Sequence, residues 1–323
     1  MKTALVTAIG SFSAEIVIQS LKQHGITVVG CDMFPKELIV NAYSVDVFYQ
    51  VSRGTDRDRY ISEIKDICTR EKVDYLLPLT DAEIDTLNDN RTWFQENGVQ
   101  LCISSETAIK ICRDKYRTYQ VLKKHNLRIG IIPTIIAADY NVKSFPDQPT
   151  VCKPFNGRSS QGMQRLYSRN ELLSYLSVID PKQYILQPFI SGHIITVDIV
   201  RNPATGNVVC MPRKELLRTL SGAGTSVHVF HDELLSEECK KIAEYLEIQG
   251  CVNFEFIQST EGKYFFLECN PRFSGGVKFS CMTGYDFVQA HMNCFSGKDI
   301  EPLGQYKDCY IARKYTETIT AFE

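Results

Sequence analysis

Residues 251–272 read CVNFEFIQSTEGKYFFLECNPR, and this stretch decides how the second half of the chain folds. It holds two runs rich in apolar and aromatic residues, 251–258 and 263–270, on either side of a short polar turn. Such a pattern is typical of an antiparallel β-hairpin. In a hairpin with this turn, Glu255 falls opposite Glu268, and a slip of one residue would put Glu255 on the other face.

Three oxygen-bearing side chains share one face of this predicted hairpin. Glu268 and Asn270 are two residues apart, so they point the same way, and Glu255 joins them from the other strand. Carboxylates in an apolar hairpin are costly unless a cation lies between them. Oxygen ligands in this number suit Mg²⁺, with phosphate oxygens completing its coordination shell. We therefore predict a metal site here, and the alternative is a solvated hairpin face with scattered acids.

A lysine and a loop of small residues lie earlier in the chain. Lys153 belongs to a short predicted strand, residues 150–154, and a loop follows it. The small residues of this loop are Gly157, Ser159, Ser160 and Gly162. Small residues let backbone N–H groups approach phosphate oxygens, and the lysine adds a positive charge. A flexible surface hairpin would look much the same, but beside a metal site the pattern favours phosphate binding.

Two further positions bear on function. Arg272 follows Asn270 by two residues, where a guanidinium can hold the charge of a transferring phosphoryl group or an oxyanion; an ordinary surface arginine is the alternative. Gly10 is the one glycine between the first predicted strand and helix, which falls short of a dinucleotide-binding fingerprint. Asp32 ends the second strand, where a ribose-binding acid would lie, but acids often end strands. Nicotinamide binding is therefore disfavoured.

Outward from these motifs, the N-terminal part of the chain alternates short apolar strands with amphipathic helices. The predicted strands are residues 3–7, 27–31, 47–51, 75–79 and 99–103, and the predicted helices are 13–24, 56–70 and 81–97. This alternation predicts a parallel sheet with helices on both faces. A small α+β unit follows, and then a mainly β region. The predicted strands of that region are residues 194–201, 207–211, 251–258 and 263–270, and its predicted helix is 236–247.

Composition limits the classes of function. With 323 residues, the chain is long enough for roughly two or three domains. Its 36 basic and 38 acidic residues give a formal net charge of −2, so no general attraction to nucleic acid or anionic membrane is expected. No apolar run approaches the roughly 20 residues that span a bilayer, and the N-terminus lacks a signal-peptide pattern, which favours the cytoplasm. The 12 cysteines form no CxxC pair and are interpreted as reduced, buried thiols.

Read in order, these pieces resemble the ATP-grasp superfamily, and within it the carbamoyl-phosphate-synthase-like and pyrrolysine-biosynthesis-ligase-like branch. The resemblance covers nearly the whole chain. It implies an α/β fold in which a Rossmann-like pre-ATP-grasp domain, residues 1–112, precedes a two-lobed α+β ATP-grasp domain. The small lobe would span residues 113–190, and the large lobe with the metal site and the C-terminal tail would span residues 191–323.

Several short motifs carry the resemblance. They are residues 78–83 after the fourth strand, Asp114-Lys115, residues 151–154 with the second ATP lysine, the phosphate-covering loop 157–162, the adenine hinge 187–192, the loop 213–225, and Glu255 with residues 268–272. The last motif, with its upstream glutamate, is the most specific. Two departures concern nucleotide binding: the hinge has Gln187 where an acid is usual, and His193, Ile194 and Ile195 replace a glutamate that grips ribose.

The resemblance implies a role for each matched residue. Lys115 and Lys153 would neutralise phosphate charge. The nucleotide would also contact the loop at Gly157, Ser159, Ser160 and Gly162 and the hinge at Gln187, Pro188, Phe189 and Ile190. Glu255, Glu268 and Asn270 would bind Mg²⁺, with Mn²⁺ as an alternative ion. Arg272 and Lys153 would be catalytic.

The resemblance also implies a reaction, namely ADP-forming ligation of a small carboxylate to an amine, or to a thiol, through an acyl phosphate. No nucleic-acid or membrane partner is expected, and a homodimer is compatible with the family. One alternative is an enzyme that phosphorylates or carboxylates and whose acceptor is not an amine. Another is a catalytically weakened nucleotide-binding protein that acts as a sensor or assembly partner. An oxidoreductase is disfavoured by the single glycine.

The substrates are not evident from the sequence. Arg213, Arg218 and Lys278 are candidate carboxylate binders, although a solvated surface base is the preferred interpretation of each. The C-terminal segment, residues 301–323, contains apolar and aromatic side chains and is expected to pack on the body of the protein.

Overall fold

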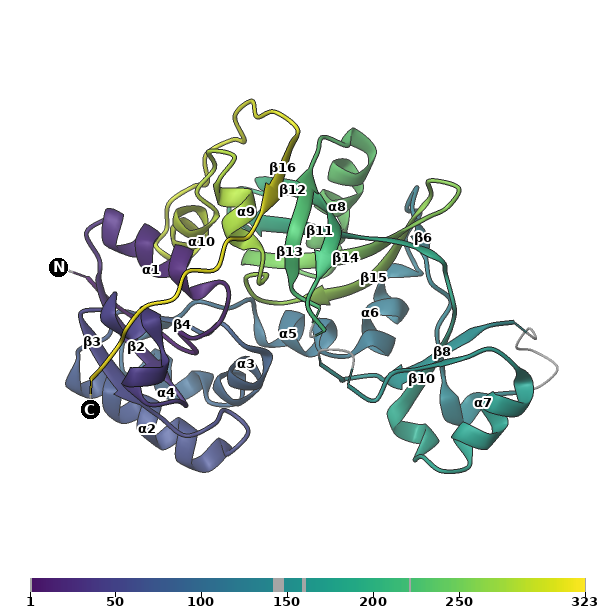
Figure 1. Cartoon of the computed structure of the whole chain (residues 1–323), viewed down its shortest axis with the longest axis horizontal. Helices are drawn as coiled ribbons and strands as arrows, with labels where there is room; N and C mark the ends of the chain where they lie inside the picture. Colours follow the sequence, from purple (N-terminus) through teal and green to yellow (C-terminus); the bar gives the residue numbers. More distant parts are fainter. Residues whose placement is uncertain (1, 142–147, 159–160, 221, 323) are drawn as a thin grey trace.

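The computed structural model describes residues 2–141, 148–158, 161–220 and 222–322, and Figure 1 shows their arrangement. Three β-sheets organise these residues. A parallel sheet with its helices lies at the lower left of Figure 1, a seven-stranded sheet lies at the top, and a small four-stranded lobe lies at the lower right.

The N-terminal sheet has five parallel strands in the order β3-β2-β1-β4-β5. Its strands are β1 (Thr3–Val6), β2 (Thr27–Asp32), β3 (Val47–Gln50), β4 (Tyr75–Leu77) and β5 (Gln100–Leu101). Its helices are α1 (Ala14–Gln23), α2 (Arg57–Arg70), α3 (Asp81–Asn88) and α4 (Arg91–Glu96), with the 3-10 turns η1 (Lys36–Leu38) and η2 (Val40–Tyr43). The predicted parallel sheet is confirmed, but the single helix predicted over residues 81–97 is two helices, α3 and α4.

The small lobe contains a four-stranded sheet in the order β7-β10-β8-β9. Its elements are β7 (Ile135–Ile136), η3 (Ala137–Asp139), β8 (Thr150–Pro154), β9 (Gln164–Leu166), α7 (Arg169–Leu176), η4 (Pro181–Gln183) and β10 (Tyr184–Pro188). Ser168 caps α7 by accepting a hydrogen bond from the Glu171 N–H. The Glu171 carboxylate in turn accepts from Tyr167 N–H over 2.8 Å.

The seven-stranded sheet has the order β16-β13-β12-β11-β14-β15-β6. Its strands are β6 (Gly130–Ile131), β11 (Gly192–Arg201), β12 (Val208–Arg218), β13 (Gly224–Val229), β14 (Gly250–Ser259), β15 (Tyr264–Asn270) and β16 (Cys309–Ala312). The helices around it are α5 (Glu106–Cys112), α6 (Lys115–Leu122), α8 (Glu233–Tyr245), α9 (Val277–Cys281) and α10 (Phe287–Phe295). The division at residues 112 and 190 stays a prediction, and the pairing of β6 with β15 places residues 130–131 in the large sheet.

Four apolar clusters hold these layers together. One lies between the N-terminal sheet and α2, α3 and α4, and another fills the small lobe. A third lies between α8 and one face of the seven-stranded sheet. The fourth joins α1 and the N-terminal sheet to α9, α10 and the opposite face of the large sheet. The N-terminal sheet and the large sheet are therefore fixed to each other by a shared core, whereas the small lobe has its own.

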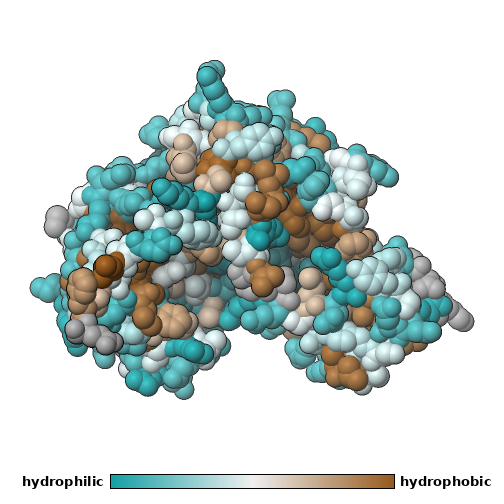
Figure 2. All heavy atoms as spheres, viewed as in Figure 1, coloured by the Kyte–Doolittle hydropathy of each residue, from teal (hydrophilic) through white to brown (hydrophobic). Residues whose placement is uncertain are grey.

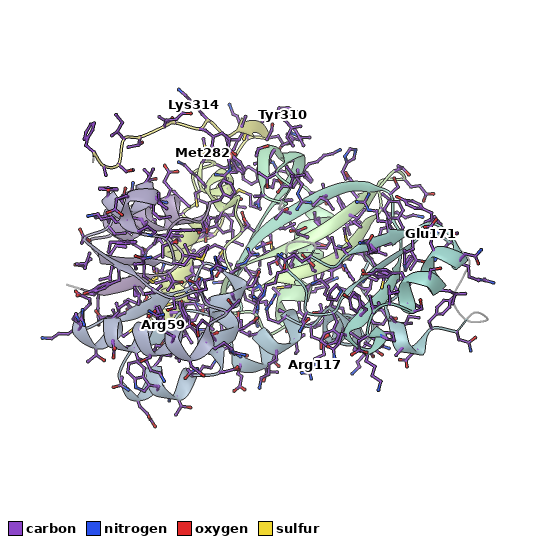
Figure 3. All side chains as sticks on the ribbon, turned by 60° about the horizontal axis from the view of Figure 1, so that its bottom comes forward. Arg59, Arg117, Glu171, Met282, Tyr310 and Lys314 are labelled. Atoms are coloured by element: carbon purple, nitrogen blue, oxygen red, sulfur yellow. The ribbon has the colours of Figure 1, made fainter. Side chains whose placement is uncertain are left out.

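The C-terminal segment crosses from one sheet to the other. Its strand β16 pairs antiparallel with β13 at the edge of the large sheet, and the following residues run across the N-terminal part of the molecule (Figure 1). Figure 3 shows Tyr310 and Lys314 along this segment. The expected packing therefore holds for Leu303, Tyr306 and Ile311, which contact the core, but Tyr310 and Tyr315 are exposed. Within the described ranges, none of the helices combines the length and hydropathy that a bilayer-spanning segment requires.

Candidate active site

Polar side chains form two rows across the centre of the seven-stranded sheet. In the first row, Arg213, Thr196, Glu255 and Glu268 are successive cross-strand partners. In the second row, Asp198, Asn253 and Asn270 are successive partners. Side chains alternate between the faces of a strand, so Phe254 and Phe256 point into the apolar cluster under α8 while the polar rows face the other way. The predicted register, with Glu255 opposite Glu268, is confirmed.

The two glutamates lie in a setting that favours a cation. Burial and the neighbouring Glu268 charge raise the pKa of Glu255 to about 7, although Arg218 opposes the rise. Burial also acts to raise the pKa of Glu268, but Lys115 and Lys153 lower it on balance. The two largely buried carboxylates repel each other, and the cations around Glu255 do not fully offset that repulsion and the cost of burial. A divalent ion would supply further positive charge.

The third predicted ligand is oriented by its neighbour. Asn270 Nδ2 donates to Asn253 Oδ1 over 3.2 Å, and this bond leaves the Asn270 carbonyl oxygen as the ligand atom. Among the described residues, no group of three or more His, Cys, Asp or Glu side chains could hold a metal ion. The donor set of two carboxylates and one amide oxygen therefore fits a magnesium-type ion only when other oxygens, such as phosphate oxygens, complete the shell.

Two lysines face these acids from different elements. Lys115 is the first residue of α6, and its Nζ lies 3.3 Å from Glu268 Oε2 and donates to the Gly157 carbonyl over 3.0 Å. Lys153 is buried on β8 of the small lobe, and burial lowers its pKa to about 8. The Glu268 charge opposes this shift and the Lys115 charge adds to it. The arrangement concentrates positive charge where a polyphosphate would lie next to the glutamates.

The small-residue loop packs directly against the end of β8. A Cβ on Gly157 would lie 3.2 Å from Pro154 Cβ, and a Cβ on Gly162 would lie 3.0 Å from Pro154 Cγ. Gly162 also has a φ of +71°, which L-residues rarely adopt. Glycine is therefore favoured at 162 by its backbone conformation, and the space beside Pro154 is tight at both positions. The predicted phosphate contacts of Ser159 and Ser160 lie outside the described residues.

The predicted adenine hinge begins in the last two residues of β10. Gln187, Pro188, Phe189 and Ile190 line the same cavity as the lysines and glutamates. Gln187 is buried and donates from Nε2 to Thr134 Oγ1 over 2.9 Å. Of the three residues in place of the ribose glutamate, Ile194 lines the cavity, whereas His193 is exposed and Ile195 is buried in the opposite core.

A cavity of about 570 Å³ connects these groups. Lys153, Gly157 and the hinge line it from the small lobe, and the polar rows, apart from the fully buried Asp198, line it from the large sheet. In Figure 2 the small lobe stands apart at the lower right, with a notch between it and the N-terminal region. The volume falls within the range of small-molecule sites, which is roughly 300 to 1,000 Å³.

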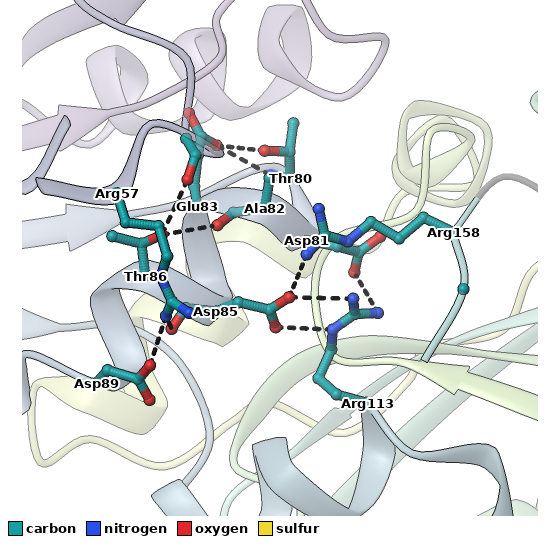
Figure 4. A network of polar contacts seen from close by, with 12 residues as sticks. Arg57, Thr80, Asp81, Ala82, Glu83, Asp85, Thr86, Asp89, Arg113 and Arg158 are labelled. Carbon is teal, nitrogen blue, oxygen red and sulfur yellow. Dashed lines mark hydrogen bonds and ion pairs between the residues drawn. The ribbon is translucent and has the colours of Figure 1, made fainter. Parts of the chain in front are cut away.

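Helix α3 contributes two carboxylates that the sequence interpretation assigned no role. Asp81 Oδ2 accepts from Arg272 Nη2 over 3.0 Å, and Asp85 binds Arg113 through both carboxylate oxygens (2.8 and 3.2 Å). Asp85 also pairs with Arg158 of the loop after β8, as Figure 4 shows. Burial acts to raise the pKa of Asp81, but Arg272 and Arg113 lower it on balance, so Asp81 stays ionised. Helix α3 thereby orients Arg272, the predicted catalytic arginine.

A signal for these acids was present in the sequence. Asp81 and Asp85 are four residues apart, so they lie on one face of a helix, directly after the motif at residues 78–83. Their arginine partners come from later parts of the chain, and sequence spacing does not show such long-range pairing. Helix α3 begins with a reciprocal capping box between Thr80 and Glu83, which fixes where its acids point.

The preferred interpretation of Arg213 as a solvated surface base is wrong. Its residue is 1% exposed, and its guanidinium pairs with Asp198 and donates to Glu215 Oε1 (3.1 Å) and Ser274 Oγ (2.8 Å). With these partners it is a buried structural anchor, not a free carboxylate binder. Lys278 pairs with Glu15 over 2.6 Å, and Arg218 donates to the Gly222 carbonyl and lies 3.5 Å from Glu255. Of the three candidates, only Arg213 and Arg218 line the cavity.

Asp32 has its oxygens occupied by its own chain. Its Oδ2 accepts from Gly10 N–H over 2.8 Å, and its Oδ1 accepts from Phe34 N–H over 3.1 Å. These bonds join the turn after β1 to the end of β2, so the acid has a structural use there. The 12 cysteines, all within the described residues, are free thiols, and ten of them are buried.

Comparisons with known families match both halves of the chain. A family model described as "PylC-like, N-terminal domain" matches residues 5–102. A second, described as "ATP-grasp in the biosynthetic pathway with Ter operon", matches residues 180–317. The carbamoyl phosphate synthase large chain of Clostridium acetobutylicum is 23% identical over 262 residues, which are 76% of this chain and 24% of the relative. The chain spans less than a quarter of the length of the curated relatives it matches.

Solved structures show the same fold. Biotin carboxylase from Campylobacter jejuni, in a complex with β,γ-ATP, aligns with a TM-score of 0.78 and 16% identity over 93% of this chain and 72% of that chain. The biotin carboxylase domain dimer of Hydrogenobacter thermophilus 2-oxoglutarate carboxylase, bound to MgADP, ADP and bicarbonate, aligns with a TM-score of 0.77 and 17% identity. This alignment covers 93% of this chain and 70% of that chain. L-amino acid ligase from Bacillus licheniformis aligns with a TM-score of 0.70 and 17% identity, over 92% of this chain and 74% of that chain.

Proposed function

The chain belongs to the ATP-grasp superfamily, with a PylC-like N-terminal domain and a distant relationship to carbamoyl phosphate synthase large chains, and from this premise we propose that it is an ATP-dependent ligase. It would activate a small carboxylate as an acyl phosphate and join it to an amine, forming a C–N bond and releasing ADP. A thiol acceptor would use the same activated intermediate.

One observation carries the proposal. Two largely buried glutamates on the large sheet, Glu255 and Glu268, line one cavity of about 570 Å³ together with two lysines, Lys115 and Lys153. Carboxylates that need a cation, beside lysines that need an anion, suit a metal-bound polyphosphate. When bound by Glu255, Glu268 and Asn270, Mg²⁺ would neutralise phosphate charge and polarise the γ-phosphoryl group.

The remaining roles belong to the chain itself. Lys115 and Lys153 would hold the phosphates, and the hinge at Gln187–Ile190 would hold the adenine. A substrate carboxylate would attack the γ-phosphorus and release ADP, and an amine would then displace phosphate from the acyl phosphate. Arg272, oriented by Asp81, would stabilise the oxyanion that forms in this second step. Enclosure between the two lobes would protect the acyl phosphate from water.

The test is a phosphate-release assay with ATP and Mg²⁺ against pooled amino acids and amines. Glu268→Ala should abolish turnover because it removes a metal ligand, while circular dichroism stays unchanged. Glu261→Ala, in the exposed turn of the same hairpin, is the matched control and should keep normal turnover. Normal turnover in Glu268→Ala would refute the metal assignment.

A second candidate function is a catalytically weakened nucleotide binder that acts as a sensor or assembly partner. Its support is Ile194, which lines the cavity where the resemblance leads us to expect a ribose-binding acid. Calorimetry separates the two functions. A chain that binds ATP with Mg²⁺ but releases no phosphate with any of the pooled substrates would favour the second.

A further inference from the structure

Glu215 is a buried carboxylate that uses only one of its two oxygens in hydrogen bonds with the described residues. It lies on β12, its side chain is 4% exposed, and it lines the cavity. Oε1 accepts from Arg213 Nε over 3.1 Å. Within the described part of the chain, the buried Oε2 has no hydrogen-bond partner. A buried polar atom without a partner is costly, so such an atom indicates a missing donor.

The cations around Glu215 do not supply that donor. Arg213 directs its other nitrogens to Asp198, Ser274 and Ser280. Arg313 lies near enough to interact electrostatically with Glu215, but its Nε and Nη2 donate to the carbonyls of Gly224 and Gly275. These arginine N–H groups near Glu215 therefore donate to other acceptor atoms and not to Oε2.

The wall beside Oε2 is built from a residue without a side chain. A Cβ on Gly224 would lie 2.0 Å from Glu215 Oε2, and a Cβ on Gly276 would lie 2.9 Å from Arg213 Nη2. Both glycines line the cavity with Glu215. Any larger residue at position 224 would displace the carboxylate, so the glycine leaves room for the Glu215 side chain beside the cavity.

Glu215 is also close to the phosphoryl-transfer centre. It is two residues beyond Arg213 on β12, and Arg213, Thr196 and Glu255 are cross-strand partners. Two strand spacings separate β12 from β14, which is about 10 Å. The Glu215 charge contributes to the raised pKa of Glu255. A group bound at Glu215 would thus be within the length of one small molecule of the metal acids.

From these contacts we infer that Glu215 Oε2 binds an ammonium group of the substrate. An ammonium group has three donors and a positive charge, which match one unpartnered, buried carboxylate oxygen. The inference rests on the proposed function, because it identifies what the ligase joins. The ammonium belongs either to the carboxylate substrate, as in an amino acid, or to a separate amine that is the acceptor.

The test measures binding by calorimetry to the full chain with a non-hydrolysable ATP analogue and Mg²⁺. The probes are the standard L-amino acids, linear diamines and the N-acetyl form of each amino acid that binds. Wild type should bind at least one amine, and N-acetylation should abolish that binding. If an amino acid binds, the ammonium belongs to the carboxylate substrate. If a diamine binds, the ammonium belongs to the acceptor.

Glu215→Gln keeps an acceptor for Arg213 but removes the charge. It should weaken amine binding roughly tenfold or more, and it should weaken binding of the ATP analogue less. Glu96→Gln, an exposed site on α4, is the matched control and should bind as wild type does. Equal amine affinity in Glu215→Gln and wild type, or binding of no amine by a wild type that binds the ATP analogue, would overturn the inference. If wild type does not bind the ATP analogue, that result counts against the proposed function. The comparison of amine affinity between Glu215→Gln and wild type still tests the role of Glu215.

Discussion

At the scale of single residues, burial decides what a charged side chain does. Arg213 would be an ordinary surface base on the evidence of its residue type, yet it is buried in the wall of the cavity, with the fully buried Asp198 beside it. Removing one partner of such a pair leaves the other as an uncompensated buried charge, which typically costs about 3–5 kcal/mol. Arg213 is thus a poor site for testing catalysis, because its loss would disturb the fold first.

The buried His291 gives a prediction for acid stability. Its Nδ1 accepts from Cys251 N–H over 2.8 Å, and burial lowers its pKa from 6.5 to about 3. Because the unfolded chain takes up this proton first, the free energy of unfolding should fall as the pH drops from about 6.5 towards 3. The slope approaches about 1.4 kcal/mol per pH unit.

His291→Asn keeps an acceptor for Cys251 but cannot be protonated in this range. Urea denaturation at pH 7.5, 6 and 5 should show the variant less stable at pH 7.5, with the difference from wild type narrowing towards pH 5. Parallel profiles for the two proteins would contradict the assignment of His291 as the titrating group.

At the scale of elements, helix α3 connects the N-terminal sheet to the loop after β8. Asp85 pairs with Arg158 of that loop and with Arg113 (Figure 4). Asp85→Asn removes the charge that holds Arg158. A part-exposed pair of this kind is worth about 1 kcal/mol, so the detached population should rise roughly fivefold.

Tryptic cleavage after Arg158, followed by mass spectrometry, measures that population. Asp89→Asn is the control, because Asp89 lies next to the same helix but pairs with exposed Arg57. Equal cleavage rates in Asp85→Asn and wild type would show that the pair does not hold the loop.

The elements that the sequence predicted well are those with regular apolar spacing. The strands of the N-terminal sheet and the hairpin β14–β15 have runs of apolar residues, and their predicted positions differ from the structure by only a few residues at each end. The last part of β12 was missed because Arg213, Glu215 and Arg218 make it polar. Strand β13 was not predicted, and β16 is a lone edge strand whose partner lies far away in sequence.

The contacts of the candidate site also fall into those that local sequence spacing predicts and those that it does not. The hairpin acids could be placed opposite each other from local spacing alone. The contacts of Asp81 with Arg272, and of Glu215 with Arg213 and Gly224, depend on how whole sheets pack and on a β-bulge in β12. Sequence patterns carry no direct signal for such contacts.

At the scale of the whole molecule, the C-terminal segment ties the large sheet to the N-terminal part. The Arg313 guanidinium lies over the rings of Phe12 (4.7 Å) and Phe279 (4.8 Å) and donates to two carbonyls. Further along, Thr320 Oγ1 donates to the Glu37 carbonyl over 2.6 Å. The segment therefore supports the relative placement of the two sheets.

Arg313→Ala should lower the free energy of unfolding by about 2–3 kcal/mol, because it removes two cation–π contacts and two hydrogen bonds. Denaturant titration measures the change. Lys314→Ala, at the exposed neighbouring position labelled in Figure 3, should be nearly neutral. Similar losses in the two variants would mean that Arg313 has no special role in joining the sheets.

The acids on α3 also limit how such proteins can be recombined. A chimera that joins a foreign N-terminal domain to the rest of this chain could restore every apolar contact between them and still leave the guanidinium of Arg272 unanchored. Grafts that retain aspartates at the positions of Asp81 and Asp85 should therefore be active more often than grafts chosen by overall similarity.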